Sequence, residues 1–228
     1  MKRSVVGWIF AFVLAIGGAA FAWLWFAGGS GEPSTELTTP SIADAAGSQS
    51  FVITAGAGSI ASFEIDEELR GSPQTVVGTT NEVAGQVQVD VSDLTTAEFS
   101  DIVINARTLK TDSERRDRAI RGPVILNSAS DEFEFITFAP TSIDGLDGAL
   151  APGEKVEFMV TGEMTIKDAT NGVVFDVSGI LVDANTIEGI ARAGVLRSDF
   201  GIGIPNVPSV TNVSDEVILT LDFVAVSG

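Results

Sequence analysis

The side chains that could do chemistry in this chain are mainly carboxylates and arginines, because the sequence contains no Cys, His or Tyr. That composition excludes a cysteine nucleophile, a His-based triad, disulfides and nearly every structural zinc site. The adjacent acids Asp66, Glu67 and Glu68 could suggest glycosidase chemistry, but neighbours on a strand point to alternate faces and do not form a facing pair. The segment from Asp144 to Gly148 lacks the alternating ligands and terminal Glu of a calcium loop. We therefore expect no catalytic residue, no metal and no resident cofactor.

A second group of charged side chains clusters in two short segments. One interpretation is a polar rim that orients a ligand head group at the mouth of a barrel. The other is a set of ion pairs that pin a helix and a late strand onto the barrel end. Charge clusters are more often structural or solvated than functional, which favours the ion pairs. The five residues are Arg116, Asp117, Arg121, Arg197 and Asp199.

The elements that must position these groups show hydrophobic alternation with a period of two. Residues 83–91, 156–166 and 217–225 each have one apolar face and one mostly polar face. Half-buried antiparallel strands have this pattern. We count about eight to nine strands over residues 51–228.

One predicted hairpin has a testable register. If Asn171-Gly172 forms a two-residue type I′ turn, an even-numbered apolar set on one strand shares a sheet face with an odd-numbered apolar set on the next. The predicted pairs are Thr170 with Val173, Ile166 with Val177, and Met164 with Gly179.

A short helix and a long strand complete the predicted fold. Residues 111–121 have Ser and Asp as possible N-caps, and they end at Gly122-Pro123. The strand from Lys155 to Lys167 would span ~40 Å, which favours a deep barrel over a sandwich. The expected fold is an all-β antiparallel barrel of about eight strands with one short helix.

The inward apolar face of the predicted strands is the candidate ligand wall. A barrel of this size can be filled with side chains or hollow, and the apolar set alone fits a packed core equally well. The candidate residues are Phe63, Ile65, Val87, Val89, Phe158, Val160, Met164, Phe175, Val177, Leu219, Leu221 and Phe223.

The N-terminus carries a long apolar run. Val5 to Ala27 holds 23 residues without a charge, and a helix of that length measures ~34 Å, enough to cross a bilayer core. Lys2 and Arg3 precede the run, and the next basic residue is Arg70. The positive-inside rule therefore predicts that everything after the run lies outside the cytoplasm.

A cleaved signal peptide is the competing interpretation, with Ala20-Phe21-Ala22 as the cleavage site. The apolar run continues past that site through Trp23 and Trp25, residues typical of a membrane interface, which favours an uncleaved anchor in residues 1–27. Residues 28–50 are rich in Gly, Ser, Thr and Pro, and predict a flexible linker with a reach of ~25 Å. We expect a single-pass protein of the cell membrane whose domain, residues 51–228, is extracytoplasmic.

The net charge excludes one class of partner. It is −18 overall, and the part after residue 27, with 11 basic and 31 acidic residues, carries −20. Such a domain repels phosphate backbones, so a role with nucleic acid is excluded. The sequence leaves the oligomeric state open.

Several segments, taken in order, resemble the landmarks of the YceI-like family over residues 58–226. They are Val77–Asp90, Leu109–Asp112 with Arg116-Asp117 and Ile120-Arg121, Phe135–Phe138, Gly162–Ile166, Arg197–Ile202 and Asp215–Leu221. The resemblance implies a lipocalin-like barrel outside the cytoplasm, whose apolar tunnel holds a long isoprenoid chain such as a polyprenyl or quinone tail. It implies binding or carriage rather than catalysis.

The chain departs from the family pattern in two ways. Members often carry a His at the end of the first strand, where this chain has Ile65-Asp66-Glu67. Many members are freely periplasmic, whereas this chain has a predicted anchor. The alternative function is a non-catalytic extracellular interaction module with a filled barrel core.

Overall fold

The computed structural model describes residues 28–205, 207 and 209–227. The predicted anchor, residues 1–27, lies outside the described residues. Within the described part of the chain, none of the helices has the length and apolar character needed to span a bilayer.

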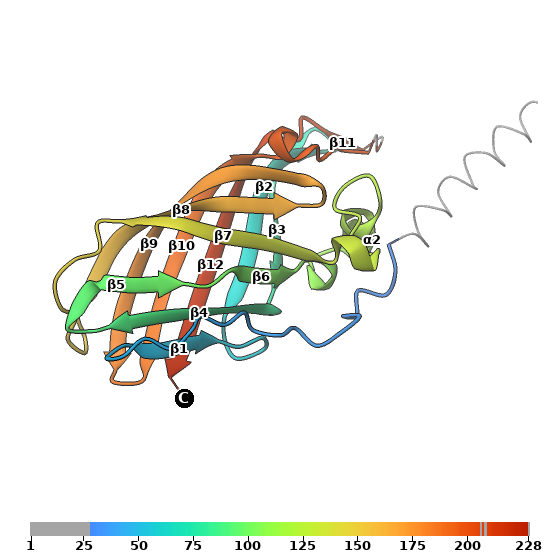
Figure 1. Ribbon diagram of the computed structural model, residues 1–228. Coiled ribbons are helices and arrows are strands. Elements are labelled where there is room, and N and C mark those ends of the chain that lie inside the picture. The colour runs from blue at the N-terminus through green and yellow to red at the C-terminus, as the bar shows by residue number, and fades with distance from the viewer. Residues whose placement is uncertain (1–27, 206, 208, 228) are drawn as a thin grey trace, which may run out of the picture.

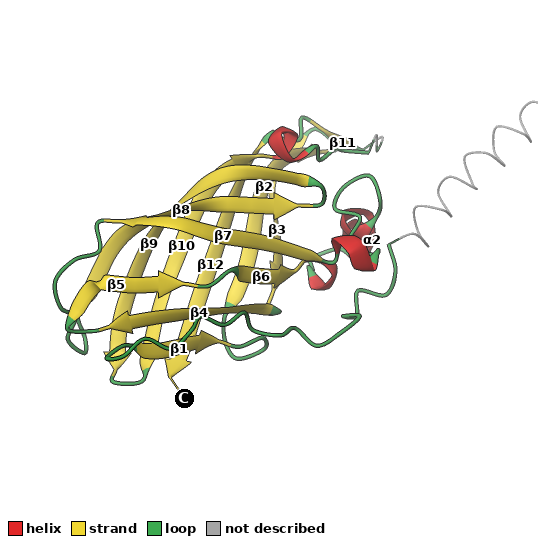
Figure 2. Cartoon of the chain, in the orientation of Figure 1, coloured by secondary structure: helices red, strands yellow, loops and turns green. Residues whose placement is uncertain are grey.

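The described residues form one antiparallel sheet that closes into a barrel (Figures 1 and 2). Its strands are β1 (Gln49–Ile53), β2 (Ile60–Leu69), β3 (Ser72–Thr80), β4 (Val83–Asp90), β5 (Asp93–Phe99), β6 (Ile102–Asn105), β7 (Phe135–Asp144), β8 (Lys155–Ile166), β9 (Ala169–Asp183), β10 (Thr186–Leu196), β11 (Val210–Thr211) and β12 (Glu216–Ser227). Eight of them form a closed ring in the order β1-β4-β6-β7-β8-β9-β10-β12, because β12 also pairs with β1. This confirms the predicted antiparallel barrel.

The wall is built differently at its two ends. Residues 226 and 227 of β12 pair with β1, whereas residues 218–222 pair with β2, which in turn pairs with β3. The outer edge of β3 meets the chain after β6 only at Thr79 and Lys110, which exchange backbone hydrogen bonds of 2.8 and 2.9 Å. Residues 106–134 therefore complete the wall there, and we call this the helix end. The opposite end, with the turns at 91–92, 145–154 and 184–185, is the far end.

The predicted helix is present and shorter than expected. Helix α2 (Glu114–Arg121) lies between β6 and β7, begins after Ser113, and ends at Gly122, whose N–H donates to the Ala119 carbonyl. Three single 3-10 turns accompany it: η1 (Ala106–Thr108), η2 (Asp131–Phe133) and η3 (Arg197–Phe200). The missing first turn has a physical cause, because the Asp117 carboxylate accepts hydrogen bonds from the Thr111 amide and hydroxyl and holds residues 111–113 as a loop.

The predicted turn of the β8–β9 hairpin is wrong. The chain turns at Lys167-Asp168, with Lys167 at φ 56°, and Gly172 lies within β9 opposite Glu163. Met164 therefore lies opposite Asn171 instead of Gly179. The partner of each residue has moved by eight positions, an even number, so both registers place the same apolar set on the inner face. Alternation could not separate them.

Residues 28–48, predicted as a flexible linker, lie along the barrel and α2 in the structure (Figure 1). The Ile42 amide donates to Gln86 Oε1 on β4 at 2.9 Å, and the Ser34 amide donates to Glu134 Oε1 at 2.9 Å. We call this segment the strap. It leads directly into β1, which starts at Gln49.

Candidate functional site

The barrel encloses a cavity of about 810 Å³ that opens at the helix end. Its wall is mainly apolar and comes from the inner faces of the strands, from α2 and from residues 200–213. At the far end the barrel is filled instead. The buried side chains that fill it and do not line the cavity are Phe51, Val83, Val89, Leu94, Leu150, Leu181 and Ala225.

Ten of the twelve predicted wall residues line this cavity. They are Phe63, Ile65, Val87, Val160, Met164, Phe175, Val177, Leu219, Leu221 and Phe223. The other two do not. Val89 is one turn of the pleat beyond Val87 and is buried in the filled far end. Phe158 packs against Phe99, with 6.1 Å between the ring centroids.

Two aromatic rings keep the lumen wide by lying flat on glycines. A Cβ at Gly78 would overlap the ring of Phe63 on the neighbouring strand, and a Cβ at Gly189 would overlap the ring of Phe223. A glycine opposite an aromatic residue allows the ring to cover the backbone. Both rings line the cavity from the wall, so they occupy little of its volume.

Part of the cavity wall was missed from the sequence. Leu109, Ile120 and Leu126 cover it from residues 106–134, and Ile202 and Ile204 cover it from the loop before β11. The alternation of Ile202 and Ile204 with glycines is a visible signal in the sequence. The contribution of α2 is not, because its sequence is dominated by charge.

The five predicted rim residues do not form one group. Arg116 and Arg197 line the cavity near its mouth, and Asp117, Arg121 and Asp199 do not. Asp117 bonds Thr111, and Arg121 Nε donates to the Gly28 carbonyl at 2.8 Å. The side chain of Asp199 is exposed, and its backbone carbonyl accepts from Asn171.

The two arginines that do line the mouth are joined to the barrel. Arg116 NH2 lies 3.3 Å from Glu67 Oε1, and Gln74 Nε2 donates to the same oxygen at 2.6 Å. Arg197 donates to the carbonyls of Ser214 and Ile202, each at 3.0 Å. Glu67 is buried although it borders an apolar cavity, and these two partners offset the cost of burying its charge. The contacts agree with the interpretation as structural ion pairs.

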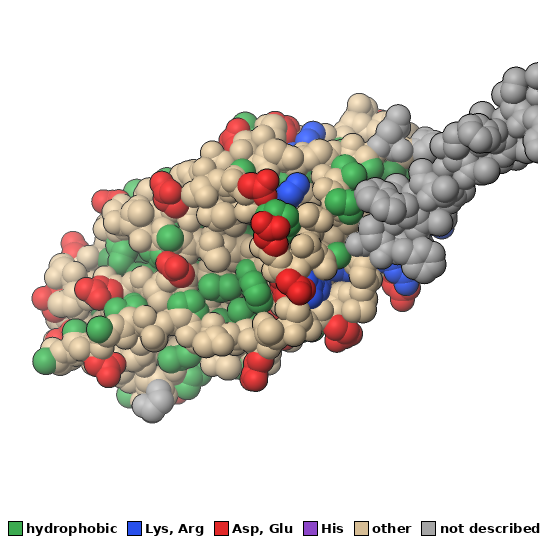
Figure 3. Space-filling model, turned by 45° about the vertical axis from the view of Figure 1, so that its right-hand side comes forward, with side chains coloured by type: hydrophobic (Ala, Val, Ile, Leu, Met, Phe, Trp, Pro, Cys, Tyr) green, Lys and Arg blue, Asp and Glu red, His purple; other side chains and the backbone are tan. Residues whose placement is uncertain are grey.

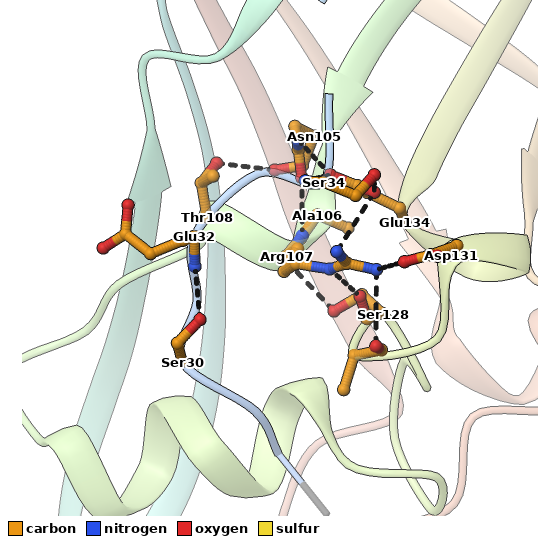
Figure 4. Close-up of polar contacts among 11 residues, drawn as sticks. Ser30, Glu32, Ser34, Asn105, Ala106, Arg107, Thr108, Ser128, Asp131 and Glu134 are labelled. Atoms are coloured by element: carbon orange, nitrogen blue, oxygen red, sulfur yellow. Dashed lines mark hydrogen bonds and ion pairs between the residues drawn. The ribbon is translucent and has the colours of Figure 1, made fainter. Parts of the chain in front are cut away.

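A polar cluster beneath α2 was not predicted from the sequence (Figure 4). Its centre is Glu134, which is fully buried and accepts from Asn105 Nδ2 at 2.8 Å and from Ser34. Arg107 NH1 lies 3.3 Å from the Glu134 carboxylate, and Arg107 NH2 lies 2.7 Å from Asp131. Burial raises the pKa of Glu134, but the bonds from Ser34 and Asn105 and the Arg107 charge outweigh it and hold that pKa below its ordinary value. The cluster fixes the strap and residues 106–134 to each other.

A closed antiparallel barrel with an apolar cavity at one end is the architecture of ligand-holding β-barrels. The YceI-like domain matches residues 46–225, which is most of the chain, so this protein belongs to the YceI-like family.

Solved structures share the fold. A polyisoprenoid binding domain from Saccharophagus degradans, implicated in plant cell wall breakdown, superposes with a TM-score of 0.61 at 14% identity, covering 79% of this chain and 99% of that one. BcnA from Burkholderia cenocepacia superposes with a TM-score of 0.56 at 20% identity, covering 74% and 96%.

In sequence, the chain is 29% identical over 122 residues to UPF0312 protein SAS2572 of Staphylococcus aureus (strain MSSA476). The match covers 51% of this chain and 63% of that relative, so it spans less than two thirds of the relative's length.

Proposed function

We propose that this protein binds and carries a long apolar ligand of the isoprenoid class, such as a polyprenyl or quinone tail. The observation that carries the proposal is the apolar cavity of about 810 Å³ at the helix end. Each buried CH₂ group contributes about 0.8 kcal/mol, so a long chain gains much from such a site. The similarity in fold to a polyisoprenoid binding domain supports the ligand class.

The proposed role is binding without catalysis. The polar side chains Glu67, Arg116 and Arg197 at the mouth already have protein partners, as described above. Their arrangement suits a wall that admits an apolar chain and gives it no reacting group.

The proposed location is the outer face of the cell membrane. The uncharged run from Val5 to Ala27, preceded by Lys2 and Arg3, supports a single-pass anchor with the barrel on the extracytoplasmic side. The membrane would then be both the site of attachment and the source of the ligand.

The test is mass spectrometry of an organic extract of the purified full chain, with two variants of adjacent residues on β8. Val160 is 4% exposed and lines the cavity, whereas Met159 is 45% exposed on the outer face. Val160→Trp should fill the lumen and abolish recovery of the isoprenoid. Met159→Trp should leave recovery unchanged.

A wild-type chain that folds, carries no lipid and binds no prenyl quinone in titration would overturn the proposal. The alternative, an interaction module that uses the barrel only as a scaffold, would then be preferred.

A further inference from the structure

The strap places the start of the described chain beside the cavity. Gly28 is buried against α2, where its carbonyl accepts from Arg121 Nε, and a Cβ at Gly28 would overlap the backbone of Arg118. Other residues of the same helix, Arg116 and Ile120 among them, line the cavity. Only the width of one helix, ~10 Å, therefore separates residue 28 from the lumen.

The strap is held along its length, so this placement is fixed. Ser34 is bonded to the buried Glu134, and Ile42 is bonded to Gln86 on β4. A free linker of this length would let the barrel stand ~25 Å from the membrane in any orientation. The bonded strap instead turns the helix end of the barrel toward whatever holds residue 27.

Exposed apolar side chains border the opening at this end. Ile204 and Val207 line the cavity and are also 37% and 41% exposed, so they lie at its rim. Val124, in the loop after α2, is exposed as well and lies close to Gly203. These three residues form an apolar rim, a feature that marks protein or membrane contact sites on soluble domains.

The distribution of charge separates the two ends. On the face in Figure 3, the Lys and Arg side chains gather toward the helix end, whereas acidic side chains cover the whole face. Nine of the eleven basic residues after residue 27 belong to the helix end: Arg70, Arg107, Lys110, Arg115, Arg116, Arg118, Arg121, Lys167 and Arg197. Several acids there are paired with these arginines, as in Asp112–Arg116, Glu114–Arg118 and Asp215–Arg197.

The far end has the opposite character. Its turns and their flanks carry Lys155 alone against six acids, which are Asp90, Asp93, Asp144, Asp147, Glu154 and Asp183. A membrane surface with anionic lipids repels the far end much more strongly than the helix end.

From these observations we propose that the helix end docks on the surface of an anionic bilayer, with the rim of Val124, Ile204 and Val207 in the lipid interface. The cavity then opens onto the membrane, and an apolar chain passes between the two without crossing water. The inference rests on the proposed function as a membrane-anchored carrier, and it names the surface and the orientation that this function uses.

The absence of Cys from the sequence makes a direct test possible, because single spin labels need no other change. Full-length Val207→Cys and Val226→Cys are labelled and placed in nanodiscs of phosphatidylglycerol and phosphatidylethanolamine. Both positions are exposed apolar residues, at 41% and 48%, and Val226 lies at the end of β12 away from the cavity. Electron paramagnetic resonance then measures collision with oxygen and with a water-soluble nickel chelate.

We expect the label at 207 to lose nickel contact severalfold and to gain oxygen contact on reconstitution, whereas the label at 226 stays in water. Equal nickel contact at the two positions would overturn docking. Loss of the protection at 207 in phosphatidylcholine nanodiscs or at high salt would support the charge contribution, and a label protected equally in neutral lipid would overturn that part.

The same nanodisc samples are extracted for isoprenoid, which keeps the two proposals distinguishable. A bound isoprenoid with a water-exposed label at 207 would contradict docking and leave the carrier function standing. A protected label with no ligand in any sample would do the reverse. As a second variant, Ile204→Asp with Val207→Asp should slow ligand loading from donor vesicles, whereas Val182→Asp with Val226→Asp, both exposed at the surface, should not.

Discussion

The two ends of this barrel share strands but differ in how their space is used. At the far end, β1 and β4 complete the ring, and fully buried side chains such as Phe51 and Val83 fill it. At the helix end, β2 and β3 take that place along the wall, and residues 106–134 cover the remaining gap. A helix occupies ~10 Å of wall and a strand only ~4.8 Å. The helix end is therefore wider, and its side chains do not meet across the centre.

The largest expected effect tests the filled end. Phe51 is completely buried at the junction of β1 with β4 and β12. Phe51→Ala should lower the free energy of unfolding by about 3–5 kcal/mol, because it leaves a cavity in close-packed surroundings. Urea denaturation measures this. A loss below about 1 kcal/mol would show that the far end is not packed as described.

The next effect tests the polar support of the helix end. Glu134→Gln should cost about 1.5–3 kcal/mol at neutral pH, since it removes the charged acceptor of Ser34 and Asn105. The pKa of Glu134 is lowered from 4.5. The stability it contributes is thus fully present above pH 4.5 and is lost as the pH falls below that value through the folded pKa.

Acid should therefore loosen the helix end before the far end. Hydrogen exchange of residues 106–134 and of the strap should rise between neutral pH and pH 3, whereas exchange in β1 and β4 should change little. In Glu134→Gln, exchange of the same segments should already be raised at neutral pH and should respond less to acid. A uniform response of both ends to acid would argue against a separate polar support.

A smaller effect compares the two ends by one change made at each. Val83→Phe at the filled end should cost about 1–3 kcal/mol, because a core without voids must shift to accept the larger ring. Val160→Phe at the hollow end should leave the urea midpoint nearly unchanged, since the ring enters the cavity. Equal costs would mean that the lumen is closed in solution.

The smallest effect checks the corrected hairpin. Gly172 lies within β9, and a Cβ there meets no atom within 4 Å. Gly172→Val should change the free energy of unfolding by less than about 0.5 kcal/mol. A loss of 1 kcal/mol or more would restore the Asn171-Gly172 turn, because a β-branched residue tolerates a left-handed backbone poorly.

The sequence predicted most of the cavity wall because alternation determines which face of a strand a residue occupies. It could not determine the position along the barrel axis, so Val87 and Val89 were grouped although only Val87 reaches the lumen. The hairpin turn failed for a related reason, since a shift by an even number of residues preserves the faces.

The polar contacts were the hardest to predict. Glu134 meets Ser34, which is 100 residues away in sequence, and Arg116 meets Glu67, which is 49 residues away. No local pattern encodes such pairs. The short helix, by contrast, was predicted because Ser113 and Gly122-Pro123 mark its ends locally.

The contact between Thr79 and Lys110 has a kinetic consequence. It is an isolated bridge of two backbone hydrogen bonds, whereas the strands of the eight-strand ring are joined by longer ladders. Segments with few such bonds open locally at a small fraction of the global unfolding free energy. Opening at this bridge leaves every ladder of the ring intact. We therefore expect the residence time of a bound chain to follow the strength of this bridge, and to be largely independent of mutations that change the overall melting temperature.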